Sequence, residues 1–476
     1  MSETAVLAPR TFRMPHTLVI VGTLVVLVLA LSWMVPSGTY QRIEKDGRQI
    51  TVPGTYHQIE KVRLGPQWLM IAPIKGFADG AMIISFLFLI GGAFNVIQET
   101  GIIHFVIRRL TIALRSRPWL EKLLIPVMMI VFSLGGSIFG MGEETIPFIL
   151  IFVPLALSLG YDSIVGVAIP FLGAAAGFAA AFFNPFTVGI AQGLAGLPLY
   201  SGFGYRVATW CIGTAVMIAW VMVYAARVKK NPQSSIVYEL DRSRDRSAWQ
   251  ADGEAQPHAE SWTTRRTLVL LLFMTSMAIL IWGILEKQWF IEEIGALFLA
   301  MGLLMGIVAG LRGDDVARHF VTGAKDMVGV ALIIACGRAL LIIARESAVL
   351  DTMLYYSANV VAPLPPVVAA FVMFAVQAVI NFFLHSGTAQ AALTMPVMTP
   401  LADLVGVTRQ TTVYAFQLCE FVNPILPTSA VTMGVLGMAR IPWEKWARWF
   451  FPLMIVLIVL SLLLLIPPVL VHWGPF

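Results

Sequence analysis

Long apolar runs recur along almost the whole chain, and they constrain its fold more than any other feature. Residues 17–35, 205–226 and 451–471 are examples. A helix needs about 20 apolar residues to cross a bilayer, and these runs are of that length. Only 12% of the 476 residues are charged, and the mean hydropathy is +0.81. The runs are continuous, unlike the alternating segments of a membrane barrel. We therefore expect an all-α polytopic membrane protein.

Basic residues lie mostly beside these apolar runs, as the positive-inside rule describes for cytoplasmic loops. Arg10 and Arg13 precede the first run, so we expect a cytoplasmic N-terminus. The same distribution explains the basic isoelectric point of about 9.1, so this value is no evidence that the protein binds nucleic acid. The three cysteines are far apart and lack metal-ligand spacing, so we expect no structural metal. The expected partners are the lipid bilayer and a small-molecule substrate.

A glycine-rich segment at residues 135–145 carries two adjacent carboxylates, Glu143 and Glu144. Its apolar flanks, residues 123–134 and 146–159, are each too short to cross a bilayer comfortably. We expect a re-entrant hairpin whose non-helical tip lies at membrane depth, surrounded by protein or by a water-filled cavity. Carboxylates at that depth are costly and indicate a functional site. The alternative is a helix–loop–helix whose tip reaches water.

Three further interruptions occur in apolar sequence. A second short-flanked pair of runs surrounds a tip near residues 381–388, and two longer runs are interrupted near residues 183–187 and 423–429. Both longer runs contain an Asn-Pro dipeptide, beginning at Asn184 and Asn423. Proline inside a helix frees a carbonyl group, and asparagine is a poor helix former. We therefore expect a second re-entrant hairpin and two broken transmembrane helices.

The two halves of the chain resemble each other weakly but in the same order. An inverted repeat with interrupted helices at corresponding positions is typical of a secondary transporter whose site lies near the membrane midplane. We interpret Asp79 and Asp326, near helix ends, as structural residues. The matching segments are 76–79 with 323–326, 98–100 with 345–347, 154–160 with 400–406, and 184–185 with 423–424.

The repeat divides the chain into four segments. They are a cytoplasmic N-terminus (1–16), a first transmembrane repeat (17–230), a cytoplasmic linker (231–266) and a second transmembrane repeat (267–476). The linker is the one long polar stretch, and we expect it to be poorly ordered. The additional span at residues 267–285 inverts the second repeat relative to the first.

The tips and breaks concentrate groups that can replace the hydration shell of a small solute. Helix N-termini offer N–H donors to a carboxylate, and unwound carbonyls offer acceptors to a cation. Each hydroxyl has the alternative of satisfying its own helix. The predicted substrate- or ion-binding residues are Gly142, Glu143, Glu144, Thr145, Asn184, Pro185, Thr187, His385, Ser386, Gly387, Thr388, Glu420, Asn423, Pro424, Thr428 and Ser429.

Charged residues within the apolar runs suggest how such a site would work. Glu143 and Glu144 cannot both ionise cheaply at low dielectric, so either they meet a cationic ligand or one carries a coupling proton. Arg338 and Asp403 are candidate charge partners. His385 is a candidate proton carrier, with a hydrogen-bonded structural histidine as the alternative.

Four motifs resemble those of the C4-dicarboxylate anaerobic carrier (DcuC-like) family, and in particular its YfcC branch of basic amino acid antiporters. They are residues 98–101 (Gln-Glu-Thr-Gly), 140–145 (Gly-Met-Gly-Glu-Glu-Thr), 183–187 (Phe-Asn-Pro-Phe-Thr) and 420–424 (Glu-Phe-Val-Asn-Pro). The resemblance implies the ion-transporter superfamily fold, elevator-type movement and a carrier that is often a homodimer. It also implies that sodium and a substrate carboxylate bind at the tips and breaks.

Together with the resemblance, these features predict a secondary transporter, either an antiporter or a symporter, for a small carboxylate-bearing metabolite. We expect it in a bacterial cytoplasmic (inner) membrane. Acidic residues outnumber basic ones near the predicted site, which favours a basic amino acid such as arginine or ornithine. The alternative is a C4-dicarboxylate such as succinate or fumarate, for which only Arg338 and His385 offer basic groups. We expect Na⁺ or H⁺ as the coupling ion and no other cofactor.

Two other classes of protein fit the sequence less well. An intramembrane enzyme is disfavoured because no His-Glu-x-x-His motif, paired aspartate motif or Ser/His pairing is visible. An ion channel is compatible with an inverted repeat, but no symmetric filter-like ring is visible.

Overall fold

The computed structural model describes residues 15–45, 48–244, 264–287 and 289–474. Among these residues, ten helical segments are long and apolar enough to cross a membrane, which confirms a polytopic helical membrane protein. The segments are α1 (Thr17–Met34), α3 (Ala81–Glu99), α5 (Pro118–Phe139), α9 (Phe203–Lys230), α11 (Thr264–Lys287), α12 (Ile291–Ala309), α14 (Val328–Glu346), α16 (Pro366–Phe383), α18 with α19 (Arg409–Leu418 and Ala430–Met438) and α20 (Trp443–Leu470).

Further elements connect or interrupt these segments. The helices are α2 (Trp68–Asp79), α4 (Ile102–Arg115), α6 (Ile146–Ser158), α7 (Ser163–Ala179), α8 (Ile190–Leu194), α10 (Tyr238–Arg244), α13 (Gly313–Asp326), α15 (Val349–Val361) and α17 (Gly387–Leu404). The strands are β1 (Gly38–Thr39), β2 (Arg42–Lys45), β3 (Arg48–Thr51) and β4 (His57–Gln58), with β1 antiparallel to β4 and β2 antiparallel to β3.

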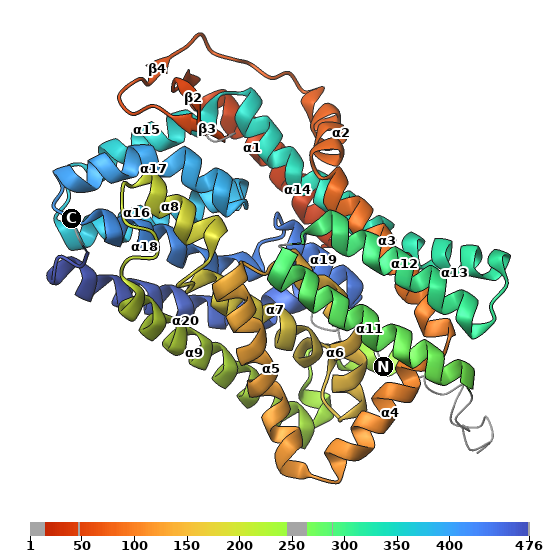
Figure 1. Cartoon of the computed structure of the whole chain (residues 1–476). Coiled ribbons are helices and arrows are strands. Elements are labelled where there is room, and N and C mark those ends of the chain that lie inside the picture. Colours follow the sequence, from red (N-terminus) through yellow and green to blue (C-terminus); the bar gives the residue numbers. More distant parts are fainter. Residues whose placement is uncertain (1–14, 46–47, 245–263, 288, 475–476) are drawn as a thin grey trace, which may run out of the picture.

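The helices pack in two groups, which Figure 1 shows. The first helix group contains two sets of three helices, α1–α3 and α12–α14. Helices α1 and α2 pack on α14, and α12 and α13 pack on α3, so the first two helices of each set pack on the third helix of the other. Small residues permit these close crossings. A Cβ atom on Gly76 would lie 2.2 Å from the carbonyl oxygen of Ala335, and one on Gly323 would lie 2.1 Å from that of Gly91.

The second helix group contains α5–α9 and α16–α20. Helices α5, α6 and α9 pack on α7, while α16, α17 and α20 pack around α18 and the turn that follows it. Along the chain, α4 and α15 connect the first group to the second. Gly177 lies so close to α5 that a Cβ atom there would lie 1.8 Å from the carbonyl oxygen of Ser133. Glycine therefore sets the spacing between α5 and α7.

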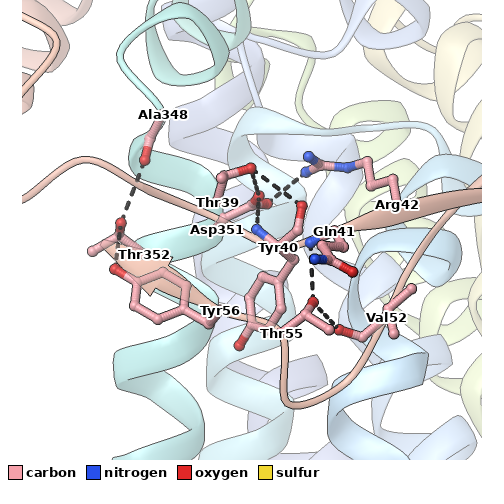
Figure 2. A network of polar contacts seen from close by, with 10 residues as sticks. All are labelled: Thr39, Tyr40, Gln41, Arg42, Val52, Thr55, Tyr56, Ala348, Asp351 and Thr352. Carbon is pink, nitrogen blue, oxygen red and sulfur yellow. Dashed lines mark hydrogen bonds and ion pairs between the residues drawn. The ribbon is translucent and has the colours of Figure 1, made fainter. Parts of the chain in front are cut away.

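The polar segment between α1 and α2 is held on α15 by a network around Asp351 (Figure 2). The buried Asp351 carboxylate accepts a hydrogen bond from the Tyr40 backbone at 3.0 Å and pairs with Arg42 at 2.6 Å. The hydroxyls of Tyr56 and Thr352 lie 3.0 Å apart. Burial and the nearby charge of Asp351 raise the pKa of Tyr40 to about 12. This segment is therefore packed against the helices as a structured cover.

The first part of the predicted linker is structured, which corrects the expectation of poor order there. Residues 231–244 form a short turn followed by α10. The carboxylate of Asp162 accepts a hydrogen bond from Ser235 at 2.7 Å, and Asp241 accepts one from the backbone at the start of α7 at 2.9 Å. Burial raises the pKa of Asp162. Residues 245–263 lie outside the described residues, and α11 already begins at Thr264, inside the predicted linker.

Candidate functional site

The first tip, residues 140–145, joins α5 to α6 and is stabilised by its own backbone. Gly140 ends α5 with a φ of +72°, a left-handed conformation that favours glycine. The carboxylate of Glu144 accepts a hydrogen bond from the Gly142 N–H at 2.8 Å. The hydroxyl of Thr145 donates to the Gly142 carbonyl at 2.6 Å. Glu144 and Thr145 therefore brace the tip from within.

The second tip, residues 384–386, joins α16 to α17 and is held by other segments. The Nε2 atom of His385 lies 2.9 Å from the hydroxyl of Thr428, in the break between α18 and α19. At the start of α17, the hydroxyl of Thr388 donates to the carbonyl of Phe186 at 3.1 Å. Phe186 belongs to the break between α7 and α8. The second tip is thus connected to both breaks.

In each break, a capping side chain lies at the start of the helical segment that follows. In the first break, residues 180–189, the side-chain oxygen of Asn184 accepts hydrogen bonds from the N–H groups of Phe186 at 2.8 Å and Thr187 at 3.3 Å. In the second break, residues 419–429, the Ser429 hydroxyl accepts from the first turn of α19 at 3.3 Å. The Ser386 hydroxyl caps α17 in the same way. These three oxygens therefore satisfy helix N-termini, as capping residues do.

Glu420 lies in the second break and is only 2% exposed. Its carboxylate accepts hydrogen bonds from the side-chain amides of Asn381, at 3.2 Å, and Asn423. The second tip packs directly against it. A Cβ atom on Gly387 would lie 3.8 Å from the Glu420 carboxylate and 2.6 Å from the methyl carbon of Thr187. Glycine at 387 therefore permits the tip to approach both breaks.

A cavity of about 690 Å³ lies between the tips, the breaks and the first helix group. Small-molecule sites have volumes of roughly 300–1,000 Å³, so this central cavity has a suitable size. Its apolar wall includes Phe171, Phe178, Phe186 and Phe290. The predicted site residues that line it are Gly142, Glu143, His385, Ser386, Gly387, Thr388, Glu420, Asn423, Pro424 and Ser429, together with the predicted charge partner Arg338.

The structure places the remaining predicted residues elsewhere. Behind the wall lie Glu144, Thr145, Asn184, Pro185, Thr187 and Thr428, where several of them support lining residues by the hydrogen bonds above. Asp403 lies away from the cavity and pairs with Arg409 at 2.7 Å, with 43% of its side chain exposed. Asp403 is therefore not a partner for the charges of the cavity.

Sequence reasoning missed one functional candidate, Asp79. We interpreted it as a structural residue near a helix end, but its carboxylate lines the central cavity and lies 3.3 Å from the guanidinium of Arg338. The signal was Arg338 itself, because a cation within an apolar helix requires an acidic partner. Sequence alone did not identify that partner, since α2 and α14 are distant along the chain.

Acidic side chains outnumber basic ones on the wall of the central cavity. Asp79, Glu143 and Glu420 line it, against the single guanidinium of Arg338. No cluster of three or more His, Cys, Asp or Glu residues suited to a metal ion occurs in the described part of the chain.

Two further cavities lie beside the helix groups. One, of about 380 Å³, is lined by residues that include Asp326 and Arg440, and the other, of about 600 Å³, includes Arg42 and Arg345. Thr388 lines both the second of these and the central cavity. Of these three cavities, all formed by described residues, the central cavity brings residues of both tips and both breaks together.

Comparisons with known proteins cover nearly the whole chain. The model of the C4-dicarboxylate anaerobic carrier family matches residues 14–470. The Escherichia coli (strain K12) protein named "Putative basic amino acid antiporter YfcC" is 38% identical over 95% of this chain and 96% of that protein. An uncharacterized protein of Haemophilus influenzae is 28% identical over 96% of this chain and 97% of that protein.

Two solved transporter structures share 16% identity with the chain. The Alcanivorax borkumensis YdaH transporter aligns over 97% of this chain and 100% of its own, with a TM-score of 0.42. Neisseria gonorrhoeae MtrF, described as illuminating a class of antimetabolite efflux pumps, aligns over 95% and 94%, with a TM-score of 0.38.

Proposed function

The chain belongs to the C4-dicarboxylate anaerobic carrier family of membrane transporters, and from this premise we propose that it exchanges basic amino acids such as arginine and ornithine. The proposed transport is secondary and is driven by a counter-substrate or by an ion gradient. The name of the Escherichia coli relative supports this substrate class.

The observation that carries the proposal is the charge of the central cavity. A basic amino acid presents one carboxylate and two cationic groups, which complement three carboxylates and one guanidinium. A C4-dicarboxylate would instead add two negative charges to a wall that already has an acidic excess. Like charges placed together in a desolvated site oppose binding, so the cavity favours the amino acid.

The proposed transport movement is a displacement of the second helix group against the first, as in an elevator. The reciprocal packing of α1 on α14 and of α12 on α3 supports an inverted repeat made of residues 17–230 and 267–476. The position of the central cavity, with walls from both groups, supports a site that opens when the groups move. An inner-membrane location, a cytoplasmic N-terminus and a homodimer belong to the same proposal.

The proposed coupling ion is Na⁺ or H⁺. Two buried side-chain oxygens in the breaks, Thr187 Oγ1 and Asn423 Oδ1, lack a hydrogen-bond partner among the described residues. Buried oxygens without donors fit a hard cation such as Na⁺, which broken helices coordinate in transporters. Glu143, at the cavity wall, is the residue that would carry a proton if H⁺ is the coupling ion.

Counterflow into proteoliposomes preloaded with arginine tests the proposal. Labelled arginine, ornithine and succinate are supplied outside, with and without a sodium gradient. We expect saturable uptake of the two basic amino acids that depends on internal arginine, and no uptake of succinate. Sodium-dependent succinate uptake without exchange of basic amino acids would overturn the proposed substrate class. Flux that neither saturates nor responds to counter-substrate would indicate a channel.

A further inference from the structure

The Asp79–Arg338 pair joins two helices of the first helix group at the wall of the central cavity. Asp79 is the last residue of α2, and Arg338 lies in the middle of α14. Their closest atoms, Oδ2 and Nη1, are 3.3 Å apart, and 30% and 26% of the two side chains are exposed. Among the described residues, Arg338 has no other ion pair or hydrogen bond. Since a guanidinium has five N–H donors, most donors of Arg338 are available to a ligand.

Arg338 is also the one lysine or arginine among the described residues that line this cavity. The other ionisable groups on the wall are the carboxyl groups of Asp79, Glu143 and Glu420 and the imidazole of His385. A guanidinium binds a carboxylate with two parallel hydrogen bonds, and charge-assisted bonds of this kind are about twice as strong as neutral ones. On this wall, Arg338 is therefore the side chain suited to bind the substrate carboxylate by charge-assisted hydrogen bonds.

The equivalent position in the other half of the chain has no charged residue. Asp326 ends α13 as Asp79 ends α2, but Asp326 pairs with Arg440, which follows α19. The offset that aligns residues 76–79 with 323–326 aligns Arg338 with Gly91 on α3. Both halves thus have the aspartate, but α3, which also contributes Met82 and Ile83 to the cavity wall, has glycine where α14 has Arg338.

We propose that Arg338 binds the carboxylate of the transported amino acid and that Asp79 is its counter-ion while the cavity is empty. This assignment rests on the proposed function, because it takes an amino acid as the substrate. Glu143 and Glu420 are left to face the cationic side chain of the substrate. Arg338 then makes the carrier select amino acids over amines that have the same side chain but no carboxylate.

Pairs of compounds that differ in one carboxylate test this selection. Arginine and agmatine form one pair, and lysine and cadaverine the other. The measurement is the concentration of each compound that half-inhibits labelled arginine counterflow in proteoliposomes. We expect the wild-type protein to prefer arginine over agmatine by at least about 10-fold. We expect Arg338→Gln to lose about 10- to 100-fold in apparent affinity for arginine, with agmatine changed less than about 2-fold.

Three further variants separate recognition from folding. In Asp79→Asn, the aspartate no longer competes with the substrate carboxylate for Arg338. We therefore expect this variant to keep its preference for arginine over agmatine and to have a higher apparent affinity for arginine. The double variant D79N/R338Q has no unpaired charge, and we expect it to match R338Q. Arg409→Gln is the matched control, because Arg409 lies away from the central cavity, where it pairs with Asp403 and donates to the Ala195 carbonyl at 3.0 Å. We expect its preference for arginine over agmatine to be unchanged. Size-exclusion profiles establish that each variant is folded.

The outcomes distinguish this assignment from the proposed function. An unchanged preference for arginine over agmatine in folded R338Q overturns the role of Arg338, while wild-type arginine exchange leaves the proposed function intact. If R338Q does not fold, the D79N variant provides the test. A lost preference for arginine over agmatine, or a lower apparent affinity for arginine, in D79N would contradict the role of Asp79 as counter-ion of Arg338. If the wild-type protein exchanges succinate and no basic amino acid, the proposed function and this assignment both fail.

Discussion

The two tips face the same cavity but are stabilised in different ways. The first tip is closed on itself, because Glu144 and Thr145 both hydrogen-bond to Gly142. The second tip is connected to other segments, through His385 to the second break and through Thr388 to the first. The backbone of the first tip is therefore held by residues of the tip itself, whereas the position of the second tip depends on both broken helices.

This difference separates ligand recognition from coupling between segments. Substitutions at the first tip should change the charge that a ligand meets, because its backbone remains braced. Substitutions at the second tip should change how the tip follows the breaks. The predictions below test that division, beginning with the largest expected effect.

Replacing Glu143 with glutamine should lower the initial rate of arginine counterflow by at least about 100-fold, because it removes a carboxylate from the cavity wall. Glu144→Gln should lower it by less than about 10-fold, because the glutamine oxygen still accepts from the Gly142 N–H. Rates are normalised to the amount of reconstituted protein. Equal losses in the two variants would contradict the different orientations of the two side chains.

His385 and Thr428, which are joined by a hydrogen bond, should act as one unit in transport. His385→Ala and Thr428→Val should each lower counterflow by about 10-fold, because each removes the same hydrogen bond. The double variant should be no worse than the more affected single variant, as residues in contact are not additive. Losses that multiply in the double variant would show that the two residues act independently.

Substitution of the asparagine in the first break and of that in the second should affect different properties of the protein. Asn184→Ala removes a cap and should lower stability by about 1 kcal/mol, measured by thermal unfolding in detergent. Asn423→Ala removes a hydrogen bond to Glu420 and an unpartnered oxygen, so it should raise the substrate or ion concentration needed for half-maximal transport. If Asn423→Ala leaves that concentration dependence unchanged, Asn423 does not bind the substrate or the coupling ion.

Asp403→Asn should have the smallest effect, below about 2-fold in counterflow, because exposed ion pairs contribute little. The informative contrast is with Asp79→Asn, which changes a residue on the cavity wall. A loss of transport in Asp403→Asn that matches the loss in Glu143→Gln would place the site away from the central cavity.

Run length and hydropathy were sufficient to predict a polytopic helical membrane protein. The direction of each side chain at the tips was not predictable, because Glu143 and Glu144 are adjacent and only the closed tip turns one toward the cavity. The Asp79–Arg338 pair depends on the packing of α2 on α14, which no local pattern encodes. The order of residues 231–244 depends on buried acceptors such as Asp162, which a polar composition does not reveal.

The account is tested most directly by an electron cryomicroscopy map of the full chain with bound arginine. We expect ligand density in the central cavity, with the carboxylate at Arg338 and the guanidinium toward Glu143. Ordered arginine in the cavity of Arg42 and Arg345 or in that of Asp326 and Arg440, with no ligand density in the central cavity, would contradict it.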